Sequence, residues 1–269
     1  MDKVAPSPAS PRPAATVIVA RDAGAEIEVL LAQRAPGLKF MANAHVFPGG
    51  ALHAGDRAEA LSVWSQRAAH AWPGTDDPEL DRALAWTAVR ETWEEVGLLL
   101  TTQPEADLSR VRELRRALHS GAALGEVLEQ LALPLDLSAL VPLIRWITPQ
   151  SEPVRFDTRF YVARAPASQT LEPDGTETTA AIWCAPKRAI AESDQKMMIL
   201  SPPTRRTLLE IADVTSVTEL LERAQQQPAA TVEPIMRIEP SGERLIVFPG
   251  DRDHPNAERV LRGPTRTIW

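Results

Sequence analysis

Three glutamates and one arginine lie within the six residues 90–95, and a pair of glycines lies upstream at 49–50. Glu91, Glu94 and Glu95 are spaced i, i+3 and i+4, so they are neighbours on one side of a helix. Such clustered negative charge is unfavourable for a helix alone, and a cation between the carboxylates would offset it. Oxygen ligands select hard cations, so the cluster predicts a Mg²⁺ or Mn²⁺ site that also receives substrate phosphates. The alternative is a solvated acidic helix face with Arg90 and Glu94 as an i,i+4 ion pair.

The helix that carries the glutamates is predicted to begin after Asp77 and to end at Gly97. Asp77 followed by Pro78 is typical of an N-cap and the first helical position. Gly97 suits the residue at which the helix must stop. An apolar stripe lies roughly opposite the acids, formed by Trp86, Val89, Trp93 and Val96. The helix therefore has one face to bury and another that presents the carboxylates.

Together with the upstream glycines, this pattern resembles the signature of the Nudix hydrolases. In that family a glycine is followed by five residues, a glutamate, seven residues and then Arg-Glu-apolar-x-Glu-Glu-x-Gly-apolar. The matching residues here are Gly50, Arg90, Glu91, Glu94, Glu95, Gly97 and Leu98. The resemblance implies an α+β fold, the Nudix α/β/α sandwich around a mixed sheet, and metal-dependent hydrolysis of a pyrophosphate bond.

We expect four of these residues to be catalytic, namely Arg90, Glu91, Glu94 and Glu95. The three glutamates and the backbone carbonyl of Gly50 would hold the metal, because glycine lets the backbone approach an ion closely. One glutamate would also act as base on water, although the sequence does not assign which one. Arg90 would orient a glutamate by a charge-assisted hydrogen bond.

The signature is interrupted in this chain. Asp56 stands where the family has glutamate, and we expect it to support the metal site. Between Asp56 and Arg90 lie 33 residues where the family has seven, so about 26 are inserted. Helical spacing of Leu61, Trp64, Ala68 and Trp72 predicts an extra helix over 57–72, within an insertion at 57–80. A split box of this kind resembles the subgroup that includes a peroxisomal coenzyme A diphosphatase.

A second resemblance, to coenzyme A-cleaving members of the family, lies upstream. It rests on Leu30-Leu31-Ala32-Gln33-Arg34-Ala35, Lys39, Asn43 and Phe47-Pro48-Gly49-Gly50. The resemblance places Arg34, Lys39, Phe47 and Gly49 at the substrate. Two of these, Arg34 and Lys39, are cations suited to the phosphates of a coenzyme A-like ligand. The alternative is that both are ordinary surface charges at the end of a strand.

Three functions remain open on this basis. The first is hydrolysis of coenzyme A or acyl-coenzyme A to 3′,5′-ADP and a phosphopantetheine. The second is hydrolysis of ADP-ribose, NADH or another dinucleotide, and the upstream pattern of Arg34 and Lys39 favours the first over it. The third is a non-catalytic nucleotide-binding regulator with a Nudix fold. The complete set of Arg90 and the three glutamates disfavours the regulator, because a binding protein need not keep all four.

Net charge, apolar run length and cysteine content limit the classes of binding partner that we expect. The net charge of −7 argues against nucleic acid, and no apolar run is long enough for a membrane helix. The single cysteine, Cys184, permits no intramolecular disulfide, which fits a cytoplasmic location. We therefore expect a small-molecule nucleotide substrate, and a homodimer is compatible with the sequence.

The domain organisation follows from composition and periodicity. Residues 1–12 are rich in proline, alanine and serine and predict a disordered lead. Residues 13–195 would form the catalytic domain, and 196–269 a helical extension packed on it. Alternating and helical hydrophobic patterns place the elements along the chain. Strands are expected at 14–20, 26–34, 44–47, 140–147, 156–163, 178–184, 232–238 and 244–248, and further helices at 108–119, 124–131, 202–212 and 216–226.

Overall fold

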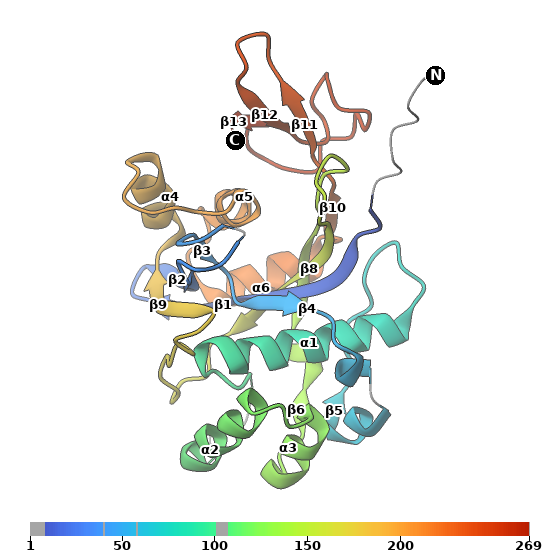
Figure 1. Ribbon diagram of the computed structural model, residues 1–269, viewed down its shortest axis with the longest axis vertical. Coiled ribbons are helices and arrows are strands. Elements are labelled where there is room, and N and C mark those ends of the chain that lie inside the picture. Colours follow the sequence, from blue (N-terminus) through green and yellow to red (C-terminus); the bar gives the residue numbers. More distant parts are fainter. Residues whose placement is uncertain (1–8, 40, 58, 101–106, 269) are drawn as a thin grey trace.

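An eight-stranded mixed sheet forms the centre of the molecule in the computed structural model, which describes residues 9–39, 41–57, 59–100 and 107–268 (Figure 1). The strand order is β10-β7-β8-β1-β2-β3, with β4 paired to β1 and β9 paired to β2. The pairs β1·β8 and β10·β7 are parallel, and the other pairs are antiparallel. The strands are β1 (Arg12–Ala23), β2 (Glu26–Arg34), β3 (His45–Val46), β4 (Gly49–Ala51), β7 (Val141–Ile147), β8 (Phe156–Arg164), β9 (Thr178–Cys184) and β10 (Ala230–Val232).

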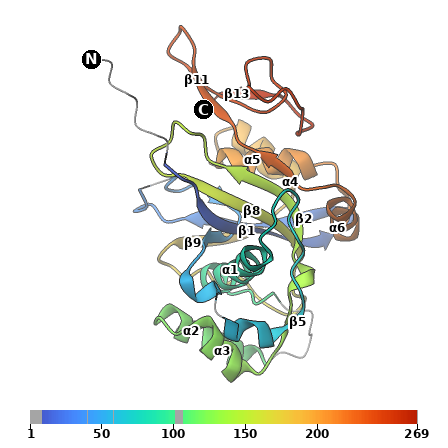
Figure 2. The ribbon, with the colours of Figure 1, turned by 90° about the vertical axis from the view of Figure 1, so that its right-hand side faces the viewer.

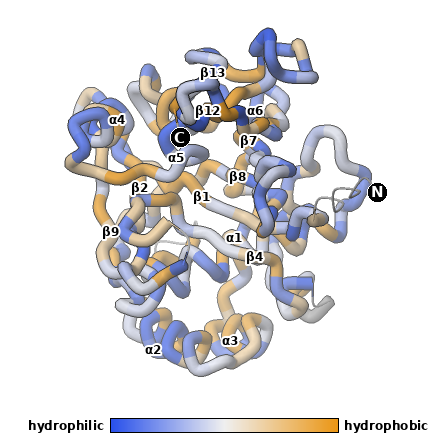
Figure 3. The backbone as a smooth tube through the Cα atoms, turned by 45° about the horizontal axis from the view of Figure 1, so that its top comes forward, coloured by the Kyte–Doolittle hydropathy of each residue, from blue (hydrophilic) through white to orange (hydrophobic). Residues whose placement is uncertain are grey.

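Helices cover both faces of this sheet (Figure 2). On one face lie α1 (Pro78–Val96), α2 (Leu108–His119) and α3 (Leu124–Leu131), and on the other α4 (Pro186–Asp194), α5 (Pro202–Ile211) and α6 (Val217–Gln226). Each face has its own hydrophobic cluster, because alternate residues of β1 and β2 point to opposite sides. Figure 3 shows the hydrophobic stretches following the central strands, while much of α2 at the periphery is hydrophilic. The predicted α/β/α sandwich is confirmed.

The start of the chain departs slightly from the predicted lead. Residues 1–8 lie outside the described residues, but β1 already begins at Arg12, whose backbone N–H donates to the carbonyl of Arg155 at 2.9 Å. In the described parts of the chain, no helix combines the length and apolar character needed to cross a membrane.

The insertion is not the helix that the sequence predicted. A 3₁₀ turn, η1 (Ala54–Arg57), leads into the insertion, which contains a second 3₁₀ turn, η2 (Glu59–Trp64), and a short strand, β5 (Ser65–Arg67). Strand β5 pairs in parallel with β6 (Leu135–Asp136), which leads into a third turn, η3 (Leu137–Ala139). Leu61 and Trp72 are both buried, but they do not lie on one helix. The backbone N–H of Trp72 donates to Asp81 Oδ2 at 3.0 Å, and its indole N–H donates to the Tyr161 hydroxyl at 3.0 Å. These tertiary bonds replace helical ones, so the helix-like spacing was misleading.

The C-terminal extension begins with helices and ends in a second, antiparallel sheet. This sheet consists of β11 (Ile235–Ile238), β12 (Arg244–Val247) and β13 (Arg266–Ile268). The single strand predicted at 232–238 is two strands, because Pro234 has no N–H with which to continue a ladder. Since β10 joins the central sheet and α5 and α6 bury their apolar faces in its second cluster, the extension packs directly on the sandwich.

Candidate active site

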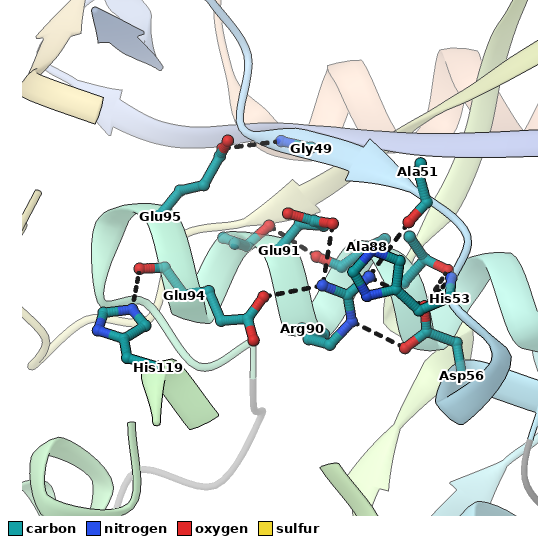
Figure 4. A network of polar contacts seen from close by, with 12 residues as sticks. Gly49, Ala51, His53, Asp56, Ala88, Arg90, Glu91, Glu94, Glu95 and His119 are labelled. Atoms are coloured by element: carbon teal, nitrogen blue, oxygen red, sulfur yellow. Dashed lines mark hydrogen bonds and ion pairs between the residues drawn. The ribbon is translucent and has the colours of Figure 1, made fainter. Parts of the chain in front are cut away.

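Helix α1 has the boundaries that its capping residues predicted. The Asp77 carboxylate accepts the backbone N–H of Leu80 at 2.9 Å, and Gly97 adopts a left-handed conformation with φ 79°. Trp86 and Trp93 are fully buried in the hydrophobic cluster that includes residues of α2 and α3. The carboxylates of α1 lie next to β4 and the loop before it (Figure 4).

The glycine pair passes directly over these carboxylates. It is held there because β1 pairs with β4 along Ala14–Thr16, before pairing with β2 further along. A Cβ added at Gly50 would lie 2.3 Å from Glu91 Oε1, and one added at Gly49 would lie 2.3 Å from the Ala15 carbonyl oxygen. Both distances are far shorter than van der Waals contact. A side chain at position 49 would therefore clash with the backbone, and one at position 50 would displace the Glu91 carboxylate.

The three glutamates lie near one another at the end of α1, and two of them are buried. Glu91 Oε1 and Glu94 Oε2 lie 2.9 and 2.8 Å from the same atom, Nη1 of Arg90. Glu95 Oε2 accepts the backbone N–H of Gly49 at 3.0 Å. Glu91 and Glu95 are buried, whereas Glu94 is half-buried. The cluster thus joins the end of α1 to the glycine loop.

Burial makes ionisation of the Glu91 and Glu95 carboxyls costly. It raises the pKa of Glu91 to about 7, against the lowering effect of the Arg90 charge and with a further contribution from the negative charge of Glu94. Burial, and then the charge of Glu91, raise the pKa of Glu95 well above its ordinary value. Both effects penalise the charged form in a low-dielectric setting. A cation placed among these groups would offset that cost.

Asp56 anchors Arg90. Its Oδ1 accepts from Arg90 Nε at 2.8 Å, and its Oδ2 accepts from Arg90 Nη2, the Thr87 hydroxyl and the His53 backbone N–H at 2.9–3.0 Å. Burial lowers the pKa of the Arg90 guanidinium, but the bonds to Asp56 and the neighbouring glutamates more than reverse this. Asp56 is 2% exposed and both its oxygens are engaged, so its visible role is to hold Arg90. Its expected metal role stays a prediction.

The last turn of α1 is held by residues that sequence reasoning missed. Arg115 Nη2 donates to the Glu94 carbonyl at 2.7 Å, and His119 Nε2 lies 2.8 Å from the same oxygen (Figure 4 shows His119). The backbone N–H of Asp174 donates to the Glu95 carbonyl at 3.0 Å. These partners satisfy carbonyls that a helix end leaves unpaired. The i,i+4 spacing of Arg115 and His119 on α2 was the available signal, but it did not reveal their target.

The upstream residues separate into two groups. Arg34 ends β2 near the cluster, where its charge favours the ionised form of Glu95, and Lys39 is exposed in the following loop. Phe47 is 3% exposed and packs edge-to-face on Phe160 in the cluster on the other face of the sheet. Phe47 therefore stabilises the core behind the loop, which corrects its expected place at the substrate.

The donor set suits a hard divalent cation, although the carboxylates do not converge as a ready cage. In the described parts of the chain, no three acidic, histidine or cysteine side chains are arranged to hold a metal ion. Arg90 Nη1 lies between Glu91 and Glu94, and Glu95 is turned to the Gly49 amide. All candidate donors are oxygens, and two are buried carboxylates that disfavour each other's charge. That chemistry fits Mg²⁺ or Mn²⁺.

Comparison with known proteins gives one consistent group. Residues 74–211 match the family model of the NUDT19 Nudix domain. The chain is 28% identical over 235 residues to the human acyl-coenzyme A diphosphatase NUDT19 and 26% identical over 251 residues to the chicken protein of that name. These matches cover 71% and 72% of this chain but 62% and 64% of those relatives. The crystal structure of a Nudix hydrolase from Alicyclobacillus acidocaldarius has a TM-score of 0.67 and 30% identity, covering 82% of this chain and 97% of that one.

Proposed function

The chain belongs to the Nudix hydrolases, and from that premise we propose that it hydrolyses the pyrophosphate bond of coenzyme A or an acyl-coenzyme A. The products would be 3′,5′-ADP and phosphopantetheine or its acyl derivative. The observation that carries this proposal is the buried pair Glu91 and Glu95, fixed between the Gly49-Gly50 loop and an anchored Arg90. Similarity to two acyl-coenzyme A diphosphatases supports the choice of substrate.

The cluster supplies the parts that pyrophosphate hydrolysis needs. Nudix hydrolases generally use divalent cations, and Mg²⁺ or Mn²⁺ bound here would neutralise the diphosphate and acidify water. Glu91, Glu94, Glu95 and the Gly50 carbonyl are the groups that would hold the ion. The water oxygen forms a bond to one phosphorus, the bond from that phosphorus to the bridging oxygen breaks, and a glutamate of the cluster takes the proton.

Arg90 fixes the geometry of this step. It contacts Glu91 and Glu94 through one nitrogen while Asp56 holds its other edge by two hydrogen bonds. Two parallel N–H···O bonds to one carboxylate set the guanidinium plane. The glutamates are therefore positioned before substrate arrives. Arg34 lies at the end of β2 near Glu95, and Lys39 lies in the loop that follows β2. Both side chains would bind the negatively charged phosphates.

The direct test is turnover of coenzyme A, acetyl-coenzyme A, ADP-ribose and NADH with Mg²⁺ or Mn²⁺, with products identified by mass. We expect cleavage of the coenzyme A species, and a Glu95→Gln variant should lose about a hundredfold or more in kcat/KM. Glu79→Gln is the matched control, because Glu79 is exposed in the first turn of the same helix.

Two outcomes would overturn the proposal in different ways. Fast turnover of ADP-ribose or NADH without cleavage of coenzyme A would move the substrate to another dinucleotide. Tight nucleotide binding with no turnover under any metal would instead favour the non-catalytic regulator. The cytoplasmic location and the homodimer stay predictions.

A further inference from the structure

The loop between β8 and β9 passes the C-terminal end of α1, close to the carboxylates of the proposed site (Figure 1). Its residues 172–178, the 172–178 loop, are bound to the last turn of the helix. The backbone N–H of Asp174 donates to the Glu95 carbonyl at 3.0 Å, and that of Glu172 donates to the Val96 carbonyl at 2.9 Å. A helix end leaves such carbonyls without partners inside the helix. The loop therefore fixes the backbone of Glu95.

The same loop is bound to the end of β2. The Glu177 carbonyl accepts the backbone N–H of Ala35 at 2.8 Å, one residue after Arg34. Arg34 also lies opposite Thr178 where β2 pairs with β9. One short segment thus joins the carboxylates of α1 to the cation that would bind the phosphates of the substrate.

A single carboxylate oxygen holds the shape of this loop. Asp174 Oδ1 accepts the backbone N–H of Thr176 and the hydroxyl of the same residue, the latter at 2.8 Å. It also accepts the backbone N–H of Glu177 at 2.8 Å and that of Thr178 at 3.3 Å. Aspartate and asparagine stabilise turns in this way, by accepting from backbone N–H groups that follow them. Removal of that oxygen would leave three backbone donors of the loop without this acceptor.

Charges on the loop and on the end of β2 both act on Glu95. Burial raises the pKa of Glu95 most, and the charge of Glu91 adds to this effect. Of the remaining charges, that of Glu177 raises the pKa of Glu95 and that of Arg34 lowers it. Such effects require that the charges lie near one another. The 172–178 loop and the end of β2 therefore border the same buried carboxyl.

We propose that Asp174 is a positioning residue of the hydrolytic site, which fixes Glu95 and Arg34 relative to each other by holding the 172–178 loop. This inference rests on the proposed function, in which Glu95 helps to hold the cation and Arg34 binds the phosphates. The separation of these two groups must match the separation of cation and phosphate, and small displacements of such groups reduce the rate strongly. Asp174 acts through the backbone of the loop, because its Oδ1 accepts from the loop's own donors.

Two replacements of Asp174 separate its hydrogen bonds from its charge. Asp174→Ala removes the acceptor and should raise the KM for coenzyme A about tenfold, the size expected when a displaced Arg34 loses one charge-assisted hydrogen bond. Asp174→Asn keeps an oxygen that can form the same turn, so it should restore a KM close to that of the wild type. A merely structural role would not move KM, because a loss of folded protein lowers only the apparent kcat.

Asp136→Ala is the matched control. The Oδ1 atom of Asp136 accepts the backbone N–H and the hydroxyl of Ser138 at 3.0 and 2.6 Å, the pattern that Asp174 forms with Thr176. Both aspartates are half-buried, but Asp136 lies in β6, which pairs with strand β5 of the insertion. Asp136→Ala should therefore lower the unfolding temperature without changing the KM.

Gly175→Ala perturbs the loop by another route if Asp174→Ala does not fold. Gly175 has φ 77° and no atom within 4 Å of an added Cβ, so alanine would strain the backbone without a steric clash and leave Asp174 in place. It should raise the KM for coenzyme A as Asp174→Ala does. Gly242→Ala, with φ 86° and equally open space in the turn between β11 and β12, should leave the KM unchanged. Thermal unfolding of each variant verifies the fold.

Hydrogen–deuterium exchange of the full chain, without metal or nucleotide, tests the loop independently of turnover. Asp174→Ala should speed exchange of the amides at positions 35, 172 and 174, which bind across the loop, and Asp136→Ala should not. Faster exchange together with a raised KM would support the proposal. An unchanged KM or unchanged exchange in folded Asp174→Ala would overturn it, as would an Asp174→Asn variant as impaired as Asp174→Ala.

Failure of the proposed function gives a different result. If the wild type does not cleave coenzyme A, the proposed substrate is refuted. The KM of the nucleotide that the protein does cleave, or the Kd of one that it only binds, then decides the role of Asp174 by the same comparison of variants.

Discussion

Replacing Gly50 by alanine should disable the site while leaving most of the fold intact. The added Cβ would lie 2.3 Å from Oε1, 2.5 Å from Cδ and 2.8 Å from Oε2 of Glu91. Its three nearest neighbours therefore belong to one carboxylate, the movable end of a side chain. Ordinary contact begins at 3.4 Å, so the carboxylate must move by at least 3.4 − 2.3, or about 1.1 Å.

A displacement of this size at a catalytic group costs about a hundredfold in rate. We therefore expect kcat/KM for coenzyme A to fall by about 10²-fold, equivalent to about 2.7 kcal/mol of transition-state stabilisation. The unfolding free energy should change by only about 1 kcal/mol, because no backbone atom is among the three closest neighbours. Product formation measured by mass and denaturant unfolding measured on the same preparations give the two quantities.

Two other glycines calibrate the result. Gly55→Ala, only five residues along the chain, meets nothing within 4 Å and should leave both activity and stability unchanged. Gly49→Ala meets the Ala15 carbonyl oxygen and Thr16 Cα, which are backbone atoms, and should lower the unfolding temperature clearly. Wild-type kcat/KM in a folded Gly50→Ala protein would refute the assigned contact between Gly50 and the working carboxylate. A loss of stability as large as that of Gly49→Ala would refute the claim that only Glu91 moves.

Two further predictions concern buried polar groups. Asp56→Asn removes the charge that holds Arg90, so it should lower the unfolding free energy by about 3 kcal/mol and reduce kcat. Denaturant unfolding and turnover assays measure the two effects. An unchanged kcat would show that the contact between Asp56 and Arg90 is not needed for activity. Burial lowers the pKa of His45 below its ordinary 6.5, despite the nearby charge of Glu192. The stability this confers is present above pH 6.5 and is lost as pH falls through the lower folded pKa, so a His45→Gln variant should show a flatter unfolding free energy between pH 7.5 and 5.

The parts of the site that were predictable are local along the chain. The helix from Pro78 to Val96 could be placed because its cap, its first-turn proline and its terminal glycine act within a few residues. The clustering of Glu91, Glu94 and Glu95 follows from helix periodicity alone. The longer strands of the central sheet, β1, β2, β7, β8 and β9, were also predicted from their sequence pattern, whereas the short strands β4 and β10 were not.

Contacts between distant segments were not predictable in the same way. The helix predicted for the insertion was wrong. Trp72 is held by hydrogen bonds to Asp81 and Tyr161, and the periodicity of a sequence gives no information about such contacts. Phe47 follows the pattern of a ligand-binding motif, yet its side chain packs on Phe160 in the hydrophobic cluster on the opposite face of the sheet.

The sequence by itself determined that oxygen ligands, a cationic residue and a glycine turn would lie near one helix, because spacing and residue type decide these locally. Only the tertiary structure decided which partner each group meets. In the folded protein, Arg90 donates a hydrogen bond to Asp56, the backbone N–H of Gly49 donates to Glu95, and Arg115 donates to the Glu94 carbonyl at the end of α1. The physical reason is that burial makes each of these polar groups require a partner, and which partner is within reach depends on how the sheet brings remote segments together.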